Sequence, residues 1–98
     1  MVAEACGKNF VPNIMELGGK CPVVIDASAD VDLAAKRICG IKFLNAGQVC
    51  LTADYVLCHG TLWVEFQEKV NFYMKKFFGD DILKSNQWSK VATEGKFF

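Results

Sequence analysis

The sequence has one histidine and two prolines in 98 residues, and 11 basic residues balance 11 acidic ones, so it carries no net charge. Balanced charge without a basic cluster argues against nucleic acid as a partner. Its apolar runs fall short of the roughly 18 residues that a membrane-spanning helix needs. We therefore expect neither a nucleic-acid-binding surface nor a membrane span in this chain.

The cysteines follow no metal-binding or disulfide pattern. They number five, none of their spacings is Cys-x-x-Cys, and the single histidine is His59. A zinc site would need closely spaced ligands, so we expect no metal site. The N-terminus does not resemble a secretory leader, which argues against a disulfide framework. This pattern is typical of reduced thiols in an intracellular, cytoplasmic protein, mostly buried as small apolar residues.

The apolar content is high for so short a chain. Hydrophobic residues make up 52% of it, including eight phenylalanines and two tryptophans. One interpretation is a well-filled core. The other is that part of the apolar surface meets a missing part of a larger protein. The composition leaves both open.

Periodicity and turn residues predict alternating helices and strands. The expected helices span 1–8, from Ser28 or Asp30 to about Leu44, and from 60–61 to Gly79; the expected strands span 13–17, 22–26 and 54–59. The continuous apolar run at 22–26 is typical of a strand buried in a parallel sheet. This order predicts an α/β fold, with a few mostly parallel strands alternating with helices, and an incomplete one.

Each of the two long helices has a predicted apolar face. The expected faces are Val31, Ala34, Ala35, Ile38, Ile41 and Leu44 in one helix, and Leu62, Phe66, Val70, Tyr73 and Phe77, widened by Trp63 and Met74, in the other. The i,i+4 spacing predicts surface ion pairs between Asp32 and Lys36 and between Glu65 and Lys69. We interpret both faces as core.

A polar turn, Asn45–Cys50, delivers Cys50 between a predicted helix and a predicted strand, and Glu16 stands upstream at the head of a Gly-Gly turn. A thiolate is a nucleophile and a carboxylate can act as a general base. Taken alone, however, Cys50 is more simply an ordinary buried thiol and Glu16 a surface charge. The residues by themselves do not decide between these interpretations.

Two motifs together resemble the aldehyde dehydrogenase superfamily. They are Glu16-Leu17-Gly18-Gly19-Lys20, followed by Cys21-Pro22, and Gly47-Gln48-Val49-Cys50, at the separation found in that family. The resemblance runs from Met1 to about Lys96. It is greatest to the branch that oxidises fatty and aromatic aldehydes. Val49 and Ala53 stand where that branch often has Thr and Pro, but neither is a reacting group.

The resemblance implies oxidation of an aldehyde to a carboxylic acid with NAD or NADP. Cys50 would attack the aldehyde to give a thiohemiacetal, hydride would pass to the nicotinamide, and Glu16 would activate the water that hydrolyses the thioester. Leu17, Gly18 and Gly19 would line the nicotinamide site. The backbone N–H of Cys50 would donate to the oxyanion.

The resemblance also implies that the chain is a fragment. Residues 1–17 would be the C-terminal remnant of the coenzyme-binding domain, and residues 18–98 the first part of a truncated catalytic domain. Lack of a Gly-x-Gly-x-x-Gly loop favours no coenzyme binding in isolation. The chain is then either a piece of an enzyme, inactive alone, or a non-enzymatic piece that docks on a full-length homologue. A homo-oligomer and association with a full-length homologue both stay open as partners, and membrane association is a property implied for the branch.

Overall fold

A computed structural model of the chain describes residues 1–93. Its helices are α1 (Val2–Lys8), α2 (Val31–Lys42) and α3 (Trp63–Phe78), and its strands are β1 (Pro22–Ile25) and β2 (Tyr55–Cys58). Three 3₁₀ turns, Leu44–Gly47, Gly60–Leu62 and Ile82–Lys84, complete the ordered elements. The expected alternation of helices and strands is confirmed, and so is the α/β class.

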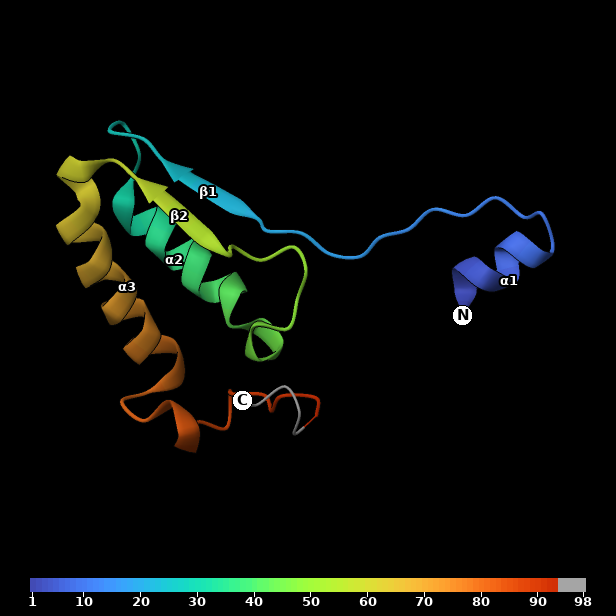
Figure 1. Ribbon diagram of the computed structural model, residues 1–98. Helices are drawn as coiled ribbons and strands as arrows, with labels where there is room; N and C mark the ends of the chain where they lie inside the picture. The colour runs from blue at the N-terminus through green and yellow to red at the C-terminus, as the bar shows by residue number, and fades with distance from the viewer. Residues whose placement is uncertain (94–98) are drawn as a thin grey trace.

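The two strands form one parallel sheet (Figure 1), in which Pro22 is opposite Tyr55 and Ile25 is opposite Cys58. Parallel neighbours cannot be joined by a tight hairpin, so the chain must cross over between them. That crossover is α2, and α3 then packs along α2 on the same side of the sheet. Segments that precede β1 and β2 therefore meet at one end of the sheet.

The core lies between this sheet and the two long helices. Its buried side chains are Ile25, Val31, Ala35, Cys39, Phe66 and Tyr73. Side chains of the predicted α3 face that are not fully buried still pack against it: Leu62, Val70, Met74 and Phe77. The α3 face is thus confirmed as core. Trp63, predicted to widen that face, is 46% exposed and is not part of the core.

The α2 face differs from its prediction. Cys39 is buried while Ile41 and Leu44 are exposed, because the buried stripe advances in steps of four from Val31 through Ala35. The helix ends at Lys42, before Leu44. Its N-cap is Asp30 rather than Ser28, and the Asp30 carboxylate accepts a hydrogen bond of 2.9 Å from the Leu33 N–H.

Asp32 joins α2 to α3 through a contact that the helical spacing did not predict. Its carboxylate is 2.8 Å from the Lys69 ammonium and accepts a 2.7 Å hydrogen bond from the Tyr73 hydroxyl. These bonds lower the pKa of Asp32, with Lys69 as the largest cause. The sequence predicted that Asp32 pairs with Lys36 and that Glu65 pairs with Lys69. Asp32 instead pairs with Lys69, because packing of α3 on α2 brings Lys69 and Tyr73 onto the first turn of α2.

Residues 13–17, predicted as a strand, are an exposed segment without ladder pairing. A strand needs a neighbour for its backbone N–H and C=O groups. Figure 1 shows this segment running away from the sheet to α1, which contributes no buried residue to the described structure. The prediction failed because local apolar residues do not supply a pairing partner. The proposed division of the chain at residues 17 and 18 stays a prediction.

Candidate active site

Cys50 lies on an exposed turn that leads into β2. It is exposed, as is Leu51 beside it, and the turn is closed by a hydrogen bond of 3.3 Å from the Thr52 N–H to the Val49 carbonyl. The Thr52 hydroxyl donates to the same carbonyl at 2.9 Å. Thr52 is only 1% exposed, so it anchors the turn in the protein while Cys50 faces solvent.

The turn is entered through a short left-handed stretch of backbone. Asn45 and Ala46 have φ values of 52° and 56°, and Gly47 follows with φ 78°. Left-handed backbone costs a residue with a Cβ atom roughly 1–2 kcal/mol. At Gly47 a Cβ would also come within 3.4 Å of the Lys42 carbonyl oxygen. Glycine here lets the chain reverse directly after α2 and present Cys50.

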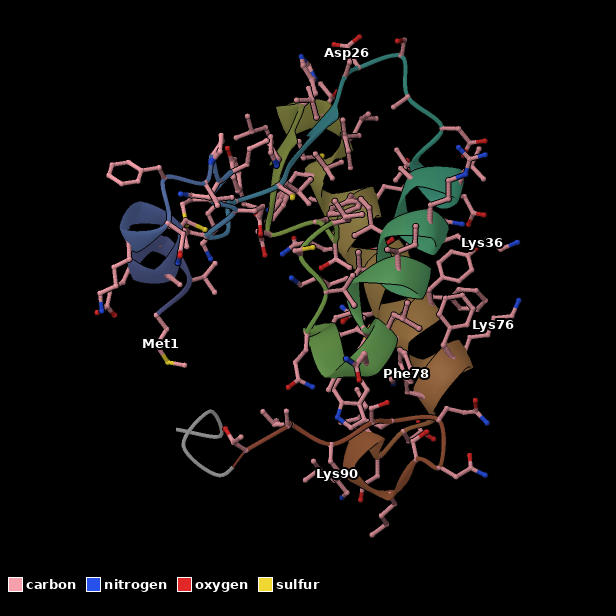
Figure 2. All side chains as sticks on the ribbon, turned by 90° about the vertical axis from the view of Figure 1, so that its right-hand side faces the viewer. Met1, Asp26, Lys36, Lys76, Phe78 and Lys90 are labelled. Carbon is pink, nitrogen blue, oxygen red and sulfur yellow. The ribbon has the colours of Figure 1, made fainter. Side chains whose placement is uncertain are left out.

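Gln48 joins this turn to a distant part of the chain. Its side-chain amide donates to the Lys90 carbonyl at 3.1 Å and accepts from the Ala92 N–H at 2.8 Å. Figure 2 shows the segment that carries Lys90 passing beneath the end of α2. The turn is therefore held by backbone groups more than 40 residues away in sequence.

Aromatic packing explains why residues 85–93 reach the turn. Trp88 packs against Phe78 at the end of α3 and against Phe43 just after α2, with ring centroids 5.2 and 5.7 Å apart. Phe43 and Phe78 meet edge to face at 5.9 Å. Such aromatic contacts add about 0.5–1.5 kcal/mol each beyond area burial. This cluster folds the segment back toward Gln48.

Asp54 fastens the amino ends of both strands. Its carboxylate accepts from the Cys21 N–H at 2.9 Å, and its own N–H donates to the Cys21 carbonyl at 2.9 Å. Lys42, the last residue of α2, makes an ion pair of 3.2 Å with the same carboxylate. The Cys21 N–H, and next the Lys42 ammonium, hold the pKa of Asp54 below its usual range.

Cys21 also lies against the turn that carries Cys50. The Cys21 thiol donates to the Cys50 carbonyl at 3.1 Å. The sequence did not identify Cys21, Lys42 or Asp54 as parts of this site. The sequence shows a positive charge, Lys42, at the end of α2 and a negative charge, Asp54, just before β2. Only the fold shows that the two charges form an ion pair.

Glu16 precedes β1, just as Cys50 precedes the parallel strand β2. Its side chain lies on an exposed segment of the chain. Its carboxylate accepts a hydrogen bond of 3.2 Å from the Gly18 N–H, two residues on. Within residues 1–93, no hydrogen bond or ion pair joins Glu16 to Cys50. The structure therefore places the two predicted catalytic residues on the segments that precede β1 and β2, without bringing them into contact.

Leu17, Gly18 and Gly19 are exposed on the same segment. Leu17 is 90% exposed, and no atom lies within 4 Å of a Cβ built on Gly18 or Gly19. The backbone of Gly18 has φ 109°, a conformation that glycine adopts without strain. A flat ring can thus approach this peptide without meeting a side chain.

Three further points of the sequence analysis concern His59, metal ligands and membrane spans. His59 follows the last residue of β2 and caps the 3₁₀ turn Gly60–Leu62, with a 2.8 Å hydrogen bond between its ring and the Thr61 hydroxyl. Among residues 1–93, no three His, Cys, Asp or Glu side chains lie close enough to hold a metal ion. No helix in that part of the chain is both long and apolar enough to cross a bilayer.

This arrangement is an α/β segment that presents a thiol from a tight turn at the entrance to a parallel strand. The sequence model for the aldehyde dehydrogenase family matches residues 1–97. The chain therefore belongs to the aldehyde dehydrogenase family.

Relatives match nearly all of this chain. It is 36% identical over 97 residues to a mouse dimeric NADP-preferring aldehyde dehydrogenase and 37% identical over 91 residues to mouse aldehyde dehydrogenase family 3 member A2. These matches cover 99% and 93% of the chain, but only 21% and 19% of the relatives. The chain thus spans about a fifth of the length of these relatives.

A solved structure also matches nearly all of this chain. The structure of Staphylococcus aureus AldH in its substrate-bound state aligns with a TM-score of 0.86 at 34% identity, covering 94% of this chain and 20% of that one. A 4,4'-diaponeurosporen-aldehyde dehydrogenase from the same organism is 35% identical over 92 residues, which is 94% of this chain and 20% of that protein. The arrangement of strands and helices is therefore a partial aldehyde dehydrogenase fold.

The bonds of Asp54 lead to a prediction about pH. Because they lower its folded pKa below the ordinary value of about 3.9, their contribution to stability is present above that pH and is lost as the pH falls through the folded pKa. Asp54→Asn should lower the urea midpoint at pH 7, and this difference from the parent should shrink at pH 3. Urea unfolding followed by circular dichroism at both pH values measures this.

Asp80→Asn is the matched control, because the Asp80 side chain is 93% exposed. Its unfolding midpoint should follow that of the parent at both pH values. If Asp54→Asn loses the same stability at pH 3 as at pH 7, the carboxylate is not what fastens the two strands.

Proposed function

We propose that this chain carries the nucleophile of an NAD- or NADP-dependent aldehyde dehydrogenase, with Cys50 as that nucleophile and a carboxylic acid as the product. The observation that carries the proposal is an exposed Cys50 on a turn anchored by Thr52 and Gln48, in a chain that matches the family over residues 1–97. The resemblance of the sequence to the branch that oxidises fatty and aromatic aldehydes favours such aldehydes as substrates.

The turn supplies what attack on an aldehyde needs. The exposed Cys50 sulfur is open to an incoming aldehyde, and as a thiolate it forms a bond with the carbonyl carbon to give a thiohemiacetal. The Cys50 N–H donates to the developing oxyanion. A nicotinamide held beside Leu17, Gly18 and Gly19 would accept the hydride, and this oxidation would convert the adduct into a thioester.

Glu16 is the general base for hydrolysis of the thioester. Since β1 and β2 are parallel, the segment before β1 and the turn before β2 lie at the same end of the sheet. The Glu16 carboxylate must leave the Gly18 N–H, 3.2 Å away, to reach a water beside Cys50. That bond is exposed and therefore worth little, so it costs little to break when the segment that carries Glu16 moves toward the Cys50 turn.

The exposed peptide at Leu17, Gly18 and Gly19 fits one face of a nicotinamide ring. Leu17 offers an apolar side chain, and the open space around both glycines admits a flat ring to the backbone. The roles of these three residues follow the family resemblance. A complete coenzyme site needs further groups that hold its phosphates and ribose.

Acyl transfer to Cys50 tests the nucleophile without coenzyme. 4-Nitrophenyl acetate should release one nitrophenolate per chain and leave an acetyl group on Cys50, because thiolate attack expels a good leaving group. Cys50→Ser should abolish this burst. Glu16→Gln should preserve the burst but slow deacetylation about 10²-fold, the lower range for general-base catalysis. Stopped-flow absorbance and intact mass follow both steps.

The matched control for this assay is Cys58→Ser, which removes a half-buried cysteine on β2 and should leave the burst unchanged. Acetylation of another cysteine, or a burst that survives Cys50→Ser, would refute the nucleophile assignment. Equal deacetylation by the parent and by Glu16→Gln would refute the role of Glu16 as base.

Coenzyme binding by the chain alone is a separate prediction. A three-residue surface buries too little of a dinucleotide to offset the loss of its translational freedom, so we expect no saturable binding of NAD or NADP. Isothermal titration into the 98-residue chain measures this, with circular dichroism confirming the helices. A saturable isotherm would show instead that the chain holds a working coenzyme site.

A second function is that the chain docks on a full-length homologue and alters its assembly. The outer face of the sheet favours it, because Val24 and Leu57 face each other across the strand pair while 71% and 57% exposed. In a larger aldehyde dehydrogenase this apolar face would be covered. Docking would bury the same face against the homologue.

Leu57→Lys should weaken docking, since it places a charge on the outer face of the sheet. Val64→Lys, at an exposed position of α3, is the matched control and should leave docking intact. The measurement is co-purification with a full-length family member together with that enzyme's activity. This second function fails if the parent chain neither co-purifies nor changes the activity.

A further inference from the structure

We propose that Cys21 and Cys50 form a reversible disulfide, in which Cys21 resolves a Cys50 that has been oxidised by a peroxide. The Cys21 thiol already donates to the Cys50 carbonyl at 3.1 Å, across 29 residues of sequence. Cys50 is exposed and Cys21 is half-buried behind it. A peroxide in solution therefore meets Cys50 first, with a second thiol already beside it.

The remaining cysteines lie elsewhere in the described structure. Cys39 is buried and points to the Val70 carbonyl at 3.8 Å, and Cys58 points to the His59 carbonyl at 3.6 Å, at the far end of β2. Cys6 lies on α1, which Figure 1 shows apart from the sheet. Cys21 is the cysteine whose thiol contacts the Cys50 residue.

Covalent geometry limits how far apart the two sulfurs can be. The Cys50 sulfur is four bonds from its own carbonyl oxygen, which allows at most about 5 Å between them. Adding the 3.1 Å contact places the two sulfurs within about 8 Å of each other. A disulfide needs Cα atoms about 4.4–6.8 Å apart, so the bond requires rotation of the Cys50 side chain together with movement of its turn toward Cys21.

Cys21 is held more firmly than Cys50, so we expect Cys50 to be the residue that moves when the disulfide forms. The backbone of Cys21 is fastened on both its N–H and its carbonyl by Asp54, each at 2.9 Å. Cys50 and the exposed Leu51 form the tip of a turn whose closing bonds join Val49 and Thr52. The tip can thus bend toward Cys21 while the base of the turn keeps its bonds.

The chemistry balances with hydrogen peroxide as the oxidant. The Cys50 thiolate attacks one peroxide oxygen and the O–O bond breaks, giving a sulfenic acid and a hydroxide ion, which takes up a proton to become water. The Cys21 thiolate then attacks the sulfenic sulfur; an S–S bond forms, the S–O bond breaks, and the oxygen leaves as water after taking a proton. The two thiols supply the two electrons, and an external thiol reverses the reaction.

The disulfide would protect Cys50 from irreversible oxidation and would block its attack on aldehydes. That last consequence rests on the proposed function. The bond itself does not, because it depends only on the two thiols and the peroxide. Mass spectrometry of the bond and acylation of the reduced chain therefore test the two proposals separately.

Peroxide oxidation of the 98-residue chain is the deciding experiment. Trypsin places Cys21 in peptide 21–36 and Cys50 in peptide 43–69, which also contains Cys58. A Cys58→Ser background removes that ambiguity. Equimolar hydrogen peroxide should link the two peptides with the loss of two hydrogen atoms, and dithiothreitol should restore both. Non-reducing peptide mapping detects the link.

Adding Cys21→Ser should abolish the link and leave Cys50 as a sulfenic acid that dimedone traps. Adding Cys6→Ser, which removes another half-buried cysteine, should leave the link intact. Circular dichroism of each variant confirms that it keeps its helices. The proposal is overturned if Cys50 proceeds to the sulfinic acid with Cys21 present, if it links to a different cysteine, or if it is not oxidised.

Discussion

The parallel pairing of β1 with β2, fastened at its start by Asp54, is the contact on which the rest of this structure depends. Asp54 joins the Cys21 backbone to the entrance of β2 and holds Lys42 at the end of α2. One carboxylate therefore positions two strands and the crossover helix. The turn that carries Cys50 lies between Lys42 and Asp54, so both of its ends are held by this contact.

The turn that carries Cys50 is anchored at its base and exposed at its tip. Thr52 is buried and bonded to the Val49 carbonyl, while Gln48 is bonded to backbone groups of residues 90 and 92. Cys50 and Leu51 project beyond these anchors. A nucleophile benefits from this combination, because its backbone stays in place while its side chain remains accessible.

Sequence patterns predicted the elements better than they predicted contacts between them. The α3 face from Leu62 to Phe77 is confirmed, since its apolar side chains repeat at helical spacing whatever they pack against. Ile41 and Leu44 were wrongly assigned to the α2 face, because which side of a short helix is buried depends on where α3 lies. Lys69 likewise pairs with Asp32 across two helices, a partner that no local spacing indicates.

The predicted strand at residues 13–17 failed for a related reason: a strand exists only with a neighbour, and its neighbour is a property of the fold. The sequence by itself determined the α/β class, the helical periods and the two motifs that place the chain in its family, since these depend on local spacing and residue type. The tertiary structure alone decided that Asp54 binds both Lys42 and Cys21, and that the Cys21 thiol contacts Cys50, because parallel pairing joins residues that are far apart in sequence.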